Sequence, residues 1–246
     1  MPDLEVRPYE KLVFVYDHLM SHVNYKLWTN YIYELSKPYV SSNDKVLELA
    51  GGNGMFSNIF LKFYPNILVT DKSFEMLSSG KNKLRKVCCE MPYIPFKNKF
   101  DLIYCTFDSI NYLTNKKDLL KLFKEVYNIL SKNGIFTFDV SLERNSLKYV
   151  AVPLRTGRRK NIRYKHLSLY NKNSRIHKNI FEIRFKGKIY KEIHRQKIYP
   201  LEVYFDLLEK AKLLAVACYE SFSFENAKPT SQRAQFIIKK INNAVI

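Results

Sequence analysis

The spacing of apolar residues changes from one segment of the chain to the next. From Tyr9 to Leu35 they recur every three or four positions, which is the repeat of one helical face. Pro38 and the polar cluster at 41–44 end this pattern. We therefore expect the chain to begin with an amphipathic helix over 9–35.

Short apolar runs then alternate with helical segments. The expected strands are 46–50, 67–70, 87–89, 100–107 and 135–140, the expected helices are 55–64, 73–84 and 116–130, and a turn is expected at 132–134. Such alternation is typical of a parallel sheet with helices on both faces.

The pattern changes again after residue 143. Polar and apolar residues alternate at 179–185 and 188–193, and hairpin turns are indicated at 171–173 and 186–188. A helix at 201–211 and strands at 213–221 and 234–239 follow. We expect 144–199 to be a small antiparallel β cap inserted late in an α/β domain, with 1–143 as an N-terminal helical lid plus the core and 200–246 completing its sheet.

Basic residues concentrate in this predicted cap. The chain has a formal net charge of +18, yet residues 1–143 hold 18 basic and 16 acidic side chains, whereas residues 144–246 hold 23 and 7. A lysine-rich genome would raise the basic content of the whole chain. The excess of basic residues in one segment therefore indicates an anionic partner. Six basic residues fall within 11 positions without an acid: Arg155, Arg158, Arg159, Lys160, Arg163 and Lys165.

Three interpretations of this basic cluster stay open. It could bind phosphates of a small ligand such as a nucleotide sugar, because guanidinium groups match phosphate oxygens in pairs. It could follow an RNA backbone, with Tyr164 and Tyr170 stacking on bases. It could also be a solvated loop without a ligand.

Other features set only broad limits. No apolar run reaches the roughly 18–20 residues that cross a bilayer, and the charged residues within 1–15 argue against a secretory signal. Cys88, Cys89, Cys105 and Cys218 show no metal-binding spacing. We expect a reduced, cytoplasmic protein without a bound metal or a membrane partner.

The first expected strand ends in a glycine-rich turn. Three of the seven glycines in the chain lie between 51 and 54. Glycine suits a tight turn whose main chain touches a ligand. Asp71 ends the next strand, where a carboxylate can accept both hydroxyl hydrogens of a ribose. These features favour an adenosine-type ligand, although Asp71 could instead cap the following helix.

The turn lacks both the phosphate-loop pattern G-x-x-x-x-G-K-[ST] and the dinucleotide pattern G-x-G-x-x-G. Val46–Gly54 instead resembles the first motif of class I S-adenosylmethionine (SAM) methyltransferases. Segments 69–77, 89–96, 100–113 and 129–140 are similar to the later motifs, in order. The match covers roughly 16–140; Ala50 is a frequent variant of the first motif, and Glu90 and Asn133 are mild departures.

This resemblance implies a Rossmann-like, doubly wound, mostly parallel seven-stranded sheet with SAM as cofactor. It implies that Asp71 binds the ribose, that Met76 flanks the adenine and Glu90 approaches its amino group, and that Tyr16 and Tyr25 lie near the methionine part. The full implied cofactor set is Tyr16, Tyr25, Glu48, Ala50, Gly51, Gly52, Gly54, Asp71, Lys72, Met76, Glu90, Met91, Thr106 and Phe107.

The segment around Tyr16 and the residues near 194–202 and 231–233 are similar to small-molecule methyltransferases, which include N-methyltransferases of amino acids and of nucleotide-linked amino sugars. Methyl transfer is an in-line displacement that needs alignment and, for many acceptors, a base. The base candidates are Tyr16, Asp108, Asp139 and His194. The expected acceptor residues are Phe107, Asp108, Asn111, Arg158, His194, Tyr199 and Arg233.

We therefore expect methyl transfer to a nitrogen or oxygen of a small acceptor, for which an anionic or phosphorylated compound is one candidate. The sequence at 105–108 differs from the Asn/Asp-Pro-Pro-Tyr/Phe run of exocyclic-amine nucleic-acid methyltransferases, and the chain has no Pro-Cys pair for cytosine carbon methylation. The alternatives are an RNA methyltransferase that uses 144–200, and a SAM-binding protein without transferase activity.

Overall fold

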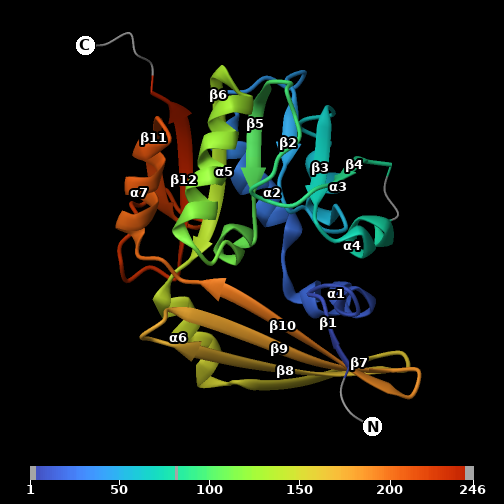
Figure 1. Cartoon of the computed structure of the whole chain (residues 1–246). Coiled ribbons are helices and arrows are strands. Elements are labelled where there is room, and N and C mark those ends of the chain that lie inside the picture. Colours follow the sequence, from blue (N-terminus) through green and yellow to red (C-terminus); the bar gives the residue numbers. More distant parts are fainter. Residues whose placement is uncertain (1–3, 81–82, 242–246) are drawn as a thin grey trace.

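The larger part of the protein is a seven-stranded sheet, seen in a computed structural model that describes residues 4–80 and 83–241 (Figure 1). The strand order is β11-β12-β6-β5-β2-β3-β4, and only β12 runs antiparallel to its neighbours. The strands are β2 (Val46–Glu48), β3 (Ile67–Asp71), β4 (Arg85–Cys88), β5 (Phe100–Cys105), β6 (Leu130–Ser141), β11 (Leu213–Glu220) and β12 (Arg233–Lys240). The predicted mostly parallel, Rossmann-like sheet is confirmed.

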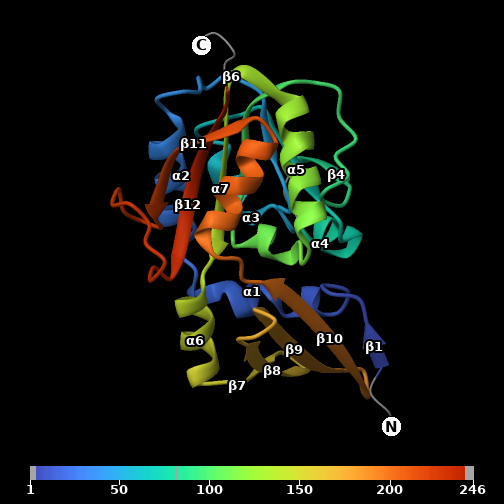
Figure 2. The same ribbon diagram turned by 60° about the vertical axis from the view of Figure 1, so that its left-hand side comes forward.

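Helices cover both faces of this sheet. One core forms against α2 (Tyr25–Ser36) and α3 (Met55–Phe60), the other against α5 (Lys116–Ile129) and α7 (Leu201–Lys210) (Figure 2). Successive strand residues alternate between the cores, because side chains in a strand point to opposite faces. Helix α4 (Phe74–Ser79) follows β3. Among the described residues, no helix is long and apolar enough to span a bilayer.

Several predicted boundaries are wrong. The single helix expected at 9–35 is four pieces: η1 (Leu12–Phe14), α1 (Tyr16–Leu19), η2 (Met20–His22) and α2. The break comes at Val23 and Asn24, where the Asn24 side chain caps α2 by accepting from the Leu27 N–H. The helices expected at 55–64 and 73–84 end at Phe60 and Ser79.

The turn expected at 132–134 lies within β6. Phe100 and Leu102 of β5 pair with Leu130 and Ile135 of β6, so the residues between them bulge from the ladder. Strand β6 therefore continues through this bulge, and the predicted turn is wrong.

A second sheet lies at the carboxyl ends of the parallel strands, and we call it the cap (Figures 1 and 2). Its order is β1-β10-β9-β8-β7. The strands are β1 (Leu4–Val6), β7 (Leu154–Arg159), β8 (Ile162–Asn171), β9 (Ile176–Phe185) and β10 (Lys188–Lys197). Strands β7 to β10 are antiparallel to one another, while β1 pairs in parallel with β10.

Two parts of the cap region were not predicted. Strand β1 comes from the start of the chain, and helix α6 (Glu143–Ala151) precedes β7. The basic cluster lies on the β7–β8 hairpin rather than in an irregular loop. The division of the chain at residues 143 and 199 stays a prediction.

Candidate active site

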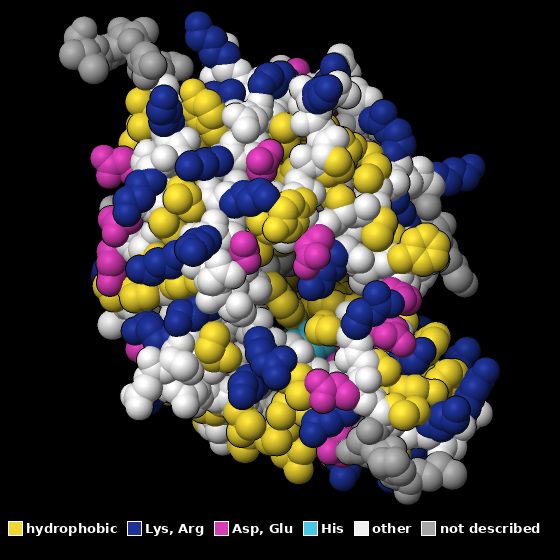
Figure 3. Space-filling model, in the orientation of Figure 1, with side chains coloured by type: hydrophobic (Ala, Val, Ile, Leu, Met, Phe, Trp, Pro, Cys, Tyr) yellow, Lys and Arg dark blue, Asp and Glu magenta, His cyan; other side chains and the backbone are white. Residues whose placement is uncertain are grey.

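A cavity of about 1060 Å³ lies between the sheet and the cap. Figure 3 shows the corresponding hollow between the two parts of the molecule. The glycine turn and the ends of β2 and β3 line one end of it, and residues of α6 and the cap strands line the other. The segment 9–25 contributes the side chains between them. The carboxyl edge of the sheet, where the sequence predicts the adenosine-type ligand, thus faces this cavity.

The glycine turn after β2 needs its glycines for two different reasons. A Cβ on Gly51 would lie 2.5 Å from Glu48 Oε2 and 2.6 Å from Val69 Cγ1, so no side chain fits there. Gly52 and Gly54 have φ angles of +57° and +75°, in the left-handed region that favours glycine. The turn therefore presents main-chain atoms to the cavity.

Glu48 lies directly beneath this turn. Its carboxyl accepts a hydrogen bond from the Ser57 hydroxyl, which is also 2.5 Å from the Tyr104 hydroxyl. Burial raises the pKa of Glu48 to about 8. The side chain is therefore largely protonated at neutral pH, so it supports the turn as a neutral group.

Asp71 is held at the end of β3 by main-chain donors. Its Oδ2 accepts from the Gly52 N–H and its Oδ1 from the Ser73 N–H, each at 2.8 Å. Ser73, and not Asp71, caps α4 through the Met76 N–H. Burial raises the pKa of Asp71, and the two N–H donors oppose that rise. Each oxygen keeps a lone pair for a ligand in the cavity.

Most of the predicted cofactor residues meet at this end of the cavity. Gly54 and Thr106 do not line it, and Lys72 and Glu90 form an exposed ion pair at 3.3 Å. The predicted cofactor residues that line it are Tyr16, Tyr25, Glu48, Ala50, Gly51, Gly52, Asp71, Lys72, Met76, Glu90, Met91 and Phe107. Trp28, which the sequence reasoning did not select, also lines it and packs on Phe107 at 4.5 Å between ring centroids.

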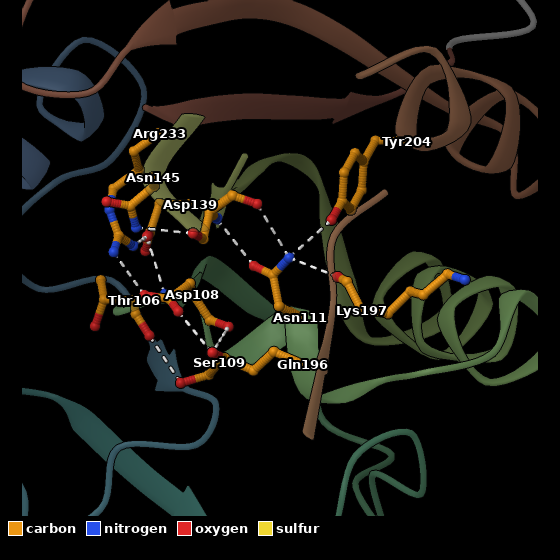
Figure 4. A network of polar contacts seen from close by, with 11 residues as sticks. Thr106, Asp108, Ser109, Asn111, Asp139, Asn145, Gln196, Lys197, Tyr204 and Arg233 are labelled. Atoms are coloured by element: carbon orange, nitrogen blue, oxygen red, sulfur yellow. Dashed lines mark hydrogen bonds and ion pairs between the residues drawn. The ribbon is translucent and has the colours of Figure 1, made fainter. Parts of the chain in front are cut away.

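Two carboxylates and one guanidinium form a network at the ends of β5, β6 and β12 (Figure 4). Arg233 Nη2 donates to Asp108 Oδ1 at 2.6 Å, and Nη1 donates to Asp139 Oδ2. Gln196 donates to Asp108 Oδ2 at 2.6 Å. Burial raises the pKa of Asp139 to about 6, although Arg233 opposes the rise. Asp108 thus accepts at both oxygens, from Arg233 and from Gln196.

The backbone at this network is strained. Phe107 and Asp108 have φ angles of +58° and +49°, which non-glycine residues rarely adopt. Strain of this kind persists where the surrounding contacts fix the chain, and it clusters at functional sites. Here it brings Phe107 and Asp108 into the cavity wall.

Three predicted acceptor residues lie elsewhere. Asn111 is buried behind the wall, where it accepts from the Ser141 N–H at 2.9 Å and donates to the Lys197 carbonyl at 2.8 Å (Figure 4). Tyr199 is buried in the core, and Arg158 is exposed on β7. None of the three lines the cavity, whereas Phe107, Asp108, His194 and Arg233 do.

His194 is buried between a tyrosine and a glutamate. Its Nδ1 lies 3.0 Å from the Tyr112 hydroxyl, and its Nε2 lies 3.1 Å from Glu192 Oε2. The Glu192 oxygens also accept from the main-chain N–H groups of Tyr9, Lys11 and Leu12 at 2.6–2.8 Å. Because Glu192 accepts at both oxygens, the imidazole hydrogen belongs on Nε2, and Nδ1 accepts from Tyr112.

Sequence reasoning missed Glu192, Tyr112 and Tyr9 as parts of this site. The Tyr112 hydroxyl lies 2.8 Å from that of Tyr9, which extends the chain of hydrogen bonds. Two signals were available. Glu192 and Glu182 are the only acids between 144 and 200, and Tyr112 falls within the segment that resembles the fourth motif.

Comparisons with known proteins agree with this geometry. Residues 46–134 match the family described as a methyltransferase domain. The whole chain is similar to an S-adenosylmethionine-dependent methyltransferase from Clostridium acetobutylicum, with 25% identity, a TM-score of 0.80, and 95% of this chain and 99% of that chain covered. The protein is a SAM-dependent methyltransferase, similar in sequence and fold to the class I members of that group. The predicted family and the predicted cofactor, SAM, are confirmed.

Two further relatives match this methyltransferase along most of its length. The Bacillus subtilis protein YqeM, named as a methyltransferase, is 28% identical over 252 residues, covering 96% of this chain and 99% of its own. The sugar N-methyltransferase KedS8 from Streptoalloteichus has a TM-score of 0.72 at 11% identity, covering 92% of this chain and 93% of its own. At that identity, KedS8 shows a shared fold alone.

Proposed function

We propose that this methyltransferase moves the SAM methyl group to a nitrogen or oxygen of a small acceptor held between the sheet and the cap. One observation carries the proposal: a single cavity joins the glycine turn and Asp71 to the polar residues of the cap. A cofactor bound at the first set would face an acceptor bound at the second. Such juxtaposition supplies much of the catalysis in a displacement reaction.

At the cofactor end, Asp71 would bind the ribose hydroxyls and the main chain at 51–52 would lie against the cofactor. Met76 and Glu90 would flank the adenine. Tyr16 would approach the methionine part as a hydrogen-bond donor rather than a base, because burial raises its pKa well above the usual range. SAM, when bound, supplies the electrophilic methyl group.

For the acceptor proton, the structure favours His194 acting through Tyr112. Asp108 has both oxygens engaged, so its role would be to hold Arg233 and Gln196 in place. Burial raises the pKa of Tyr112, which therefore keeps its own proton at neutral pH. A proton received by the Tyr112 hydroxyl could pass to His194 Nδ1, while Glu192 stabilises the resulting imidazolium.

The nature of the acceptor stays a prediction. The likeness to a sugar N-methyltransferase is consistent with an amine acceptor, and a phosphorylated compound stays a candidate. On the face seen in Figure 3, basic side chains are spread over both parts with acidic ones among them, rather than gathered in one stripe over the cap. This face therefore offers no continuous basic stripe to an RNA backbone, which supports the proposal of a small acceptor.

The test is transfer of labelled methyl from SAM to a cell extract divided into low-molecular-mass compounds and RNA. We expect label in the low-molecular-mass fraction. Label confined to RNA would support the RNA alternative, and SAM binding without any transfer would support a binding protein.

A further inference from the structure

Arg155 is a cation at the acceptor end of the cavity without a protein counterion. It lies on β7 and lines the cavity. Its Nη1 atom is buried and has no hydrogen-bond partner within the described part of the chain. Over residues 4–80 and 83–241, no carboxylate forms an ion pair with it. A buried guanidinium nitrogen without a partner is costly, so a ligand that pairs with it would bind favourably.

The carboxylates that line the cavity cannot form an ion pair with Arg155. Glu48, Asp71 and Glu90 belong to the cofactor end. Asp108 is paired with Arg233. No carboxylate that lines the cavity is therefore available to pair with Arg155.

The groups around Arg155 indicate what ligand charge this end of the cavity would match. His166, its partner across the β7–β8 ladder, lies 2.8 Å from Asn179 Oδ1 through Nε2. Burial lowers the pKa of both His166 and His177, so both imidazoles are neutral at neutral pH. Lys148 is exposed and donates to Gln232. A single half-buried guanidinium facing neutral imidazoles matches a single negative charge better than a phosphate dianion.

The geometry of the guanidinium also suits a planar anion. Arg155 Cζ lies 5.1 Å from the centre of the Tyr149 ring, a cation–π contact that helps to fix the plane of the fork. A fixed guanidinium presents two parallel N–H donors, which match the two oxygens of a carboxylate.

We propose that the acceptor of this methyltransferase carries a carboxylate group, and that Arg155 binds this carboxylate at the cap end of the cavity while the atom to be methylated faces the cofactor. The proposal rests on the proposed function and makes it specific: it selects amino or hydroxy acids from the small acceptors that the fold would admit. Arg155 is then a specificity-determining residue, and the other arginines of the β7–β8 hairpin have no part in this contact.

The experiment measures binding to protein saturated with S-adenosylhomocysteine, the demethylated cofactor. The probes are para-aminobenzoate, para-aminophenylacetate and β-alanine, each compared with its primary amide, together with para-aminophenyl phosphate. Calorimetry gives their dissociation constants for wild type, for Arg155→Gln and for Arg184→Gln. Arg184 is an exposed arginine on β9 that does not line the cavity, so its variant is the control for loss of charge.

We expect at least one carboxylate to bind about tenfold or more tightly than its amide and than the phosphate ester. Arg155→Gln should remove that advantage, whereas Arg184→Gln should keep it. An amide or phosphate ester that binds as well as the carboxylates, a carboxylate advantage that survives in Arg155→Gln, or no binding of any carboxylate to the loaded protein would each overturn the proposal. Failure of the proposed function is seen separately, in the labelled-methyl experiment, as label confined to RNA or as no transfer at all.

Discussion

The protonation of Glu48 beneath the glycine turn makes a quantitative prediction about stability. The side chain is 1% exposed, and burial raises its pKa from 4.5 to about 8. Between these pH values the folded protein keeps a proton that the unfolded chain has lost. The free energy of unfolding therefore falls as pH rises, by up to about 1.4 kcal/mol per pH unit from this group. From pH of about 5.5 to about 7.5 the loss reaches roughly 2–3 kcal/mol.

The variant Glu48→Gln removes this titration but keeps an oxygen that can accept from Ser57. Over the same pH range we expect the stability of the variant to rise by roughly 2–3 kcal/mol relative to wild type. Urea unfolding at a series of pH values, without cofactor, measures the difference, in which the other titrating groups cancel. Glu34→Gln is the control, because Glu34 is half exposed and paired with Lys37. Wild-type and Glu48→Gln stabilities that run parallel across the range would refute the reasoning.

Four further variants test other parts of the site. Gly51→Ala forces a Cβ against Glu48 and should cost about 1–3 kcal/mol in urea unfolding; unchanged stability would contradict the close approach. Asn111→Ala should cost about 2–3 kcal/mol and leave S-adenosylhomocysteine affinity unchanged, because Asn111 joins β6 to the end of β10 behind the cavity wall; a large loss of affinity would indicate a direct role. Arg233→Ala leaves two carboxylates unpaired and should cost about 3–5 kcal/mol, with a larger cost at higher pH because ionised carboxylates need the cation most; a pH-independent cost would count against the ionised network. His194→Gln should lower the methyl-transfer rate about 100-fold or more while calorimetry finds cofactor affinity unchanged; an unchanged rate would exclude it as the proton acceptor.

The larger sheet could be predicted from sequence because its signals are local. A buried parallel strand is a continuous apolar run, and the residues at its carboxyl end meet those of neighbouring strands. The glycine turn and Asp71 could thus be placed together although β3 lies well beyond the turn. The prediction of one continuous N-terminal helix was wrong for a related reason. The apolar repeat reports which side of the segment is buried, and it persists through turns that interrupt the helix.

The acceptor end could not be predicted in the same way. Its hydrogen-bond chain joins Tyr9, Tyr112 and Glu192, which are far apart in sequence, and no local pattern signals that they meet. Arg155 and Arg158 look equivalent within one basic cluster. They differ in the face of β7 that they occupy: Arg155 lines the cavity, whereas Arg158 is exposed.

The central claim is that the glycine turn and Asp71 bind the SAM adenosine, and thermal unfolding with added ligands tests it most directly. S-adenosylhomocysteine at 100 times its dissociation constant adds about 2.7 kcal/mol, which for a chain of this size raises the midpoint by roughly 5–10 °C. NAD and ATP serve as control ligands, and Asp71→Ala as the control protein. We predict a shift with SAM and S-adenosylhomocysteine alone, and a much smaller one in Asp71→Ala. A shift with NAD instead, or an equal shift in Asp71→Ala, would contradict this assignment.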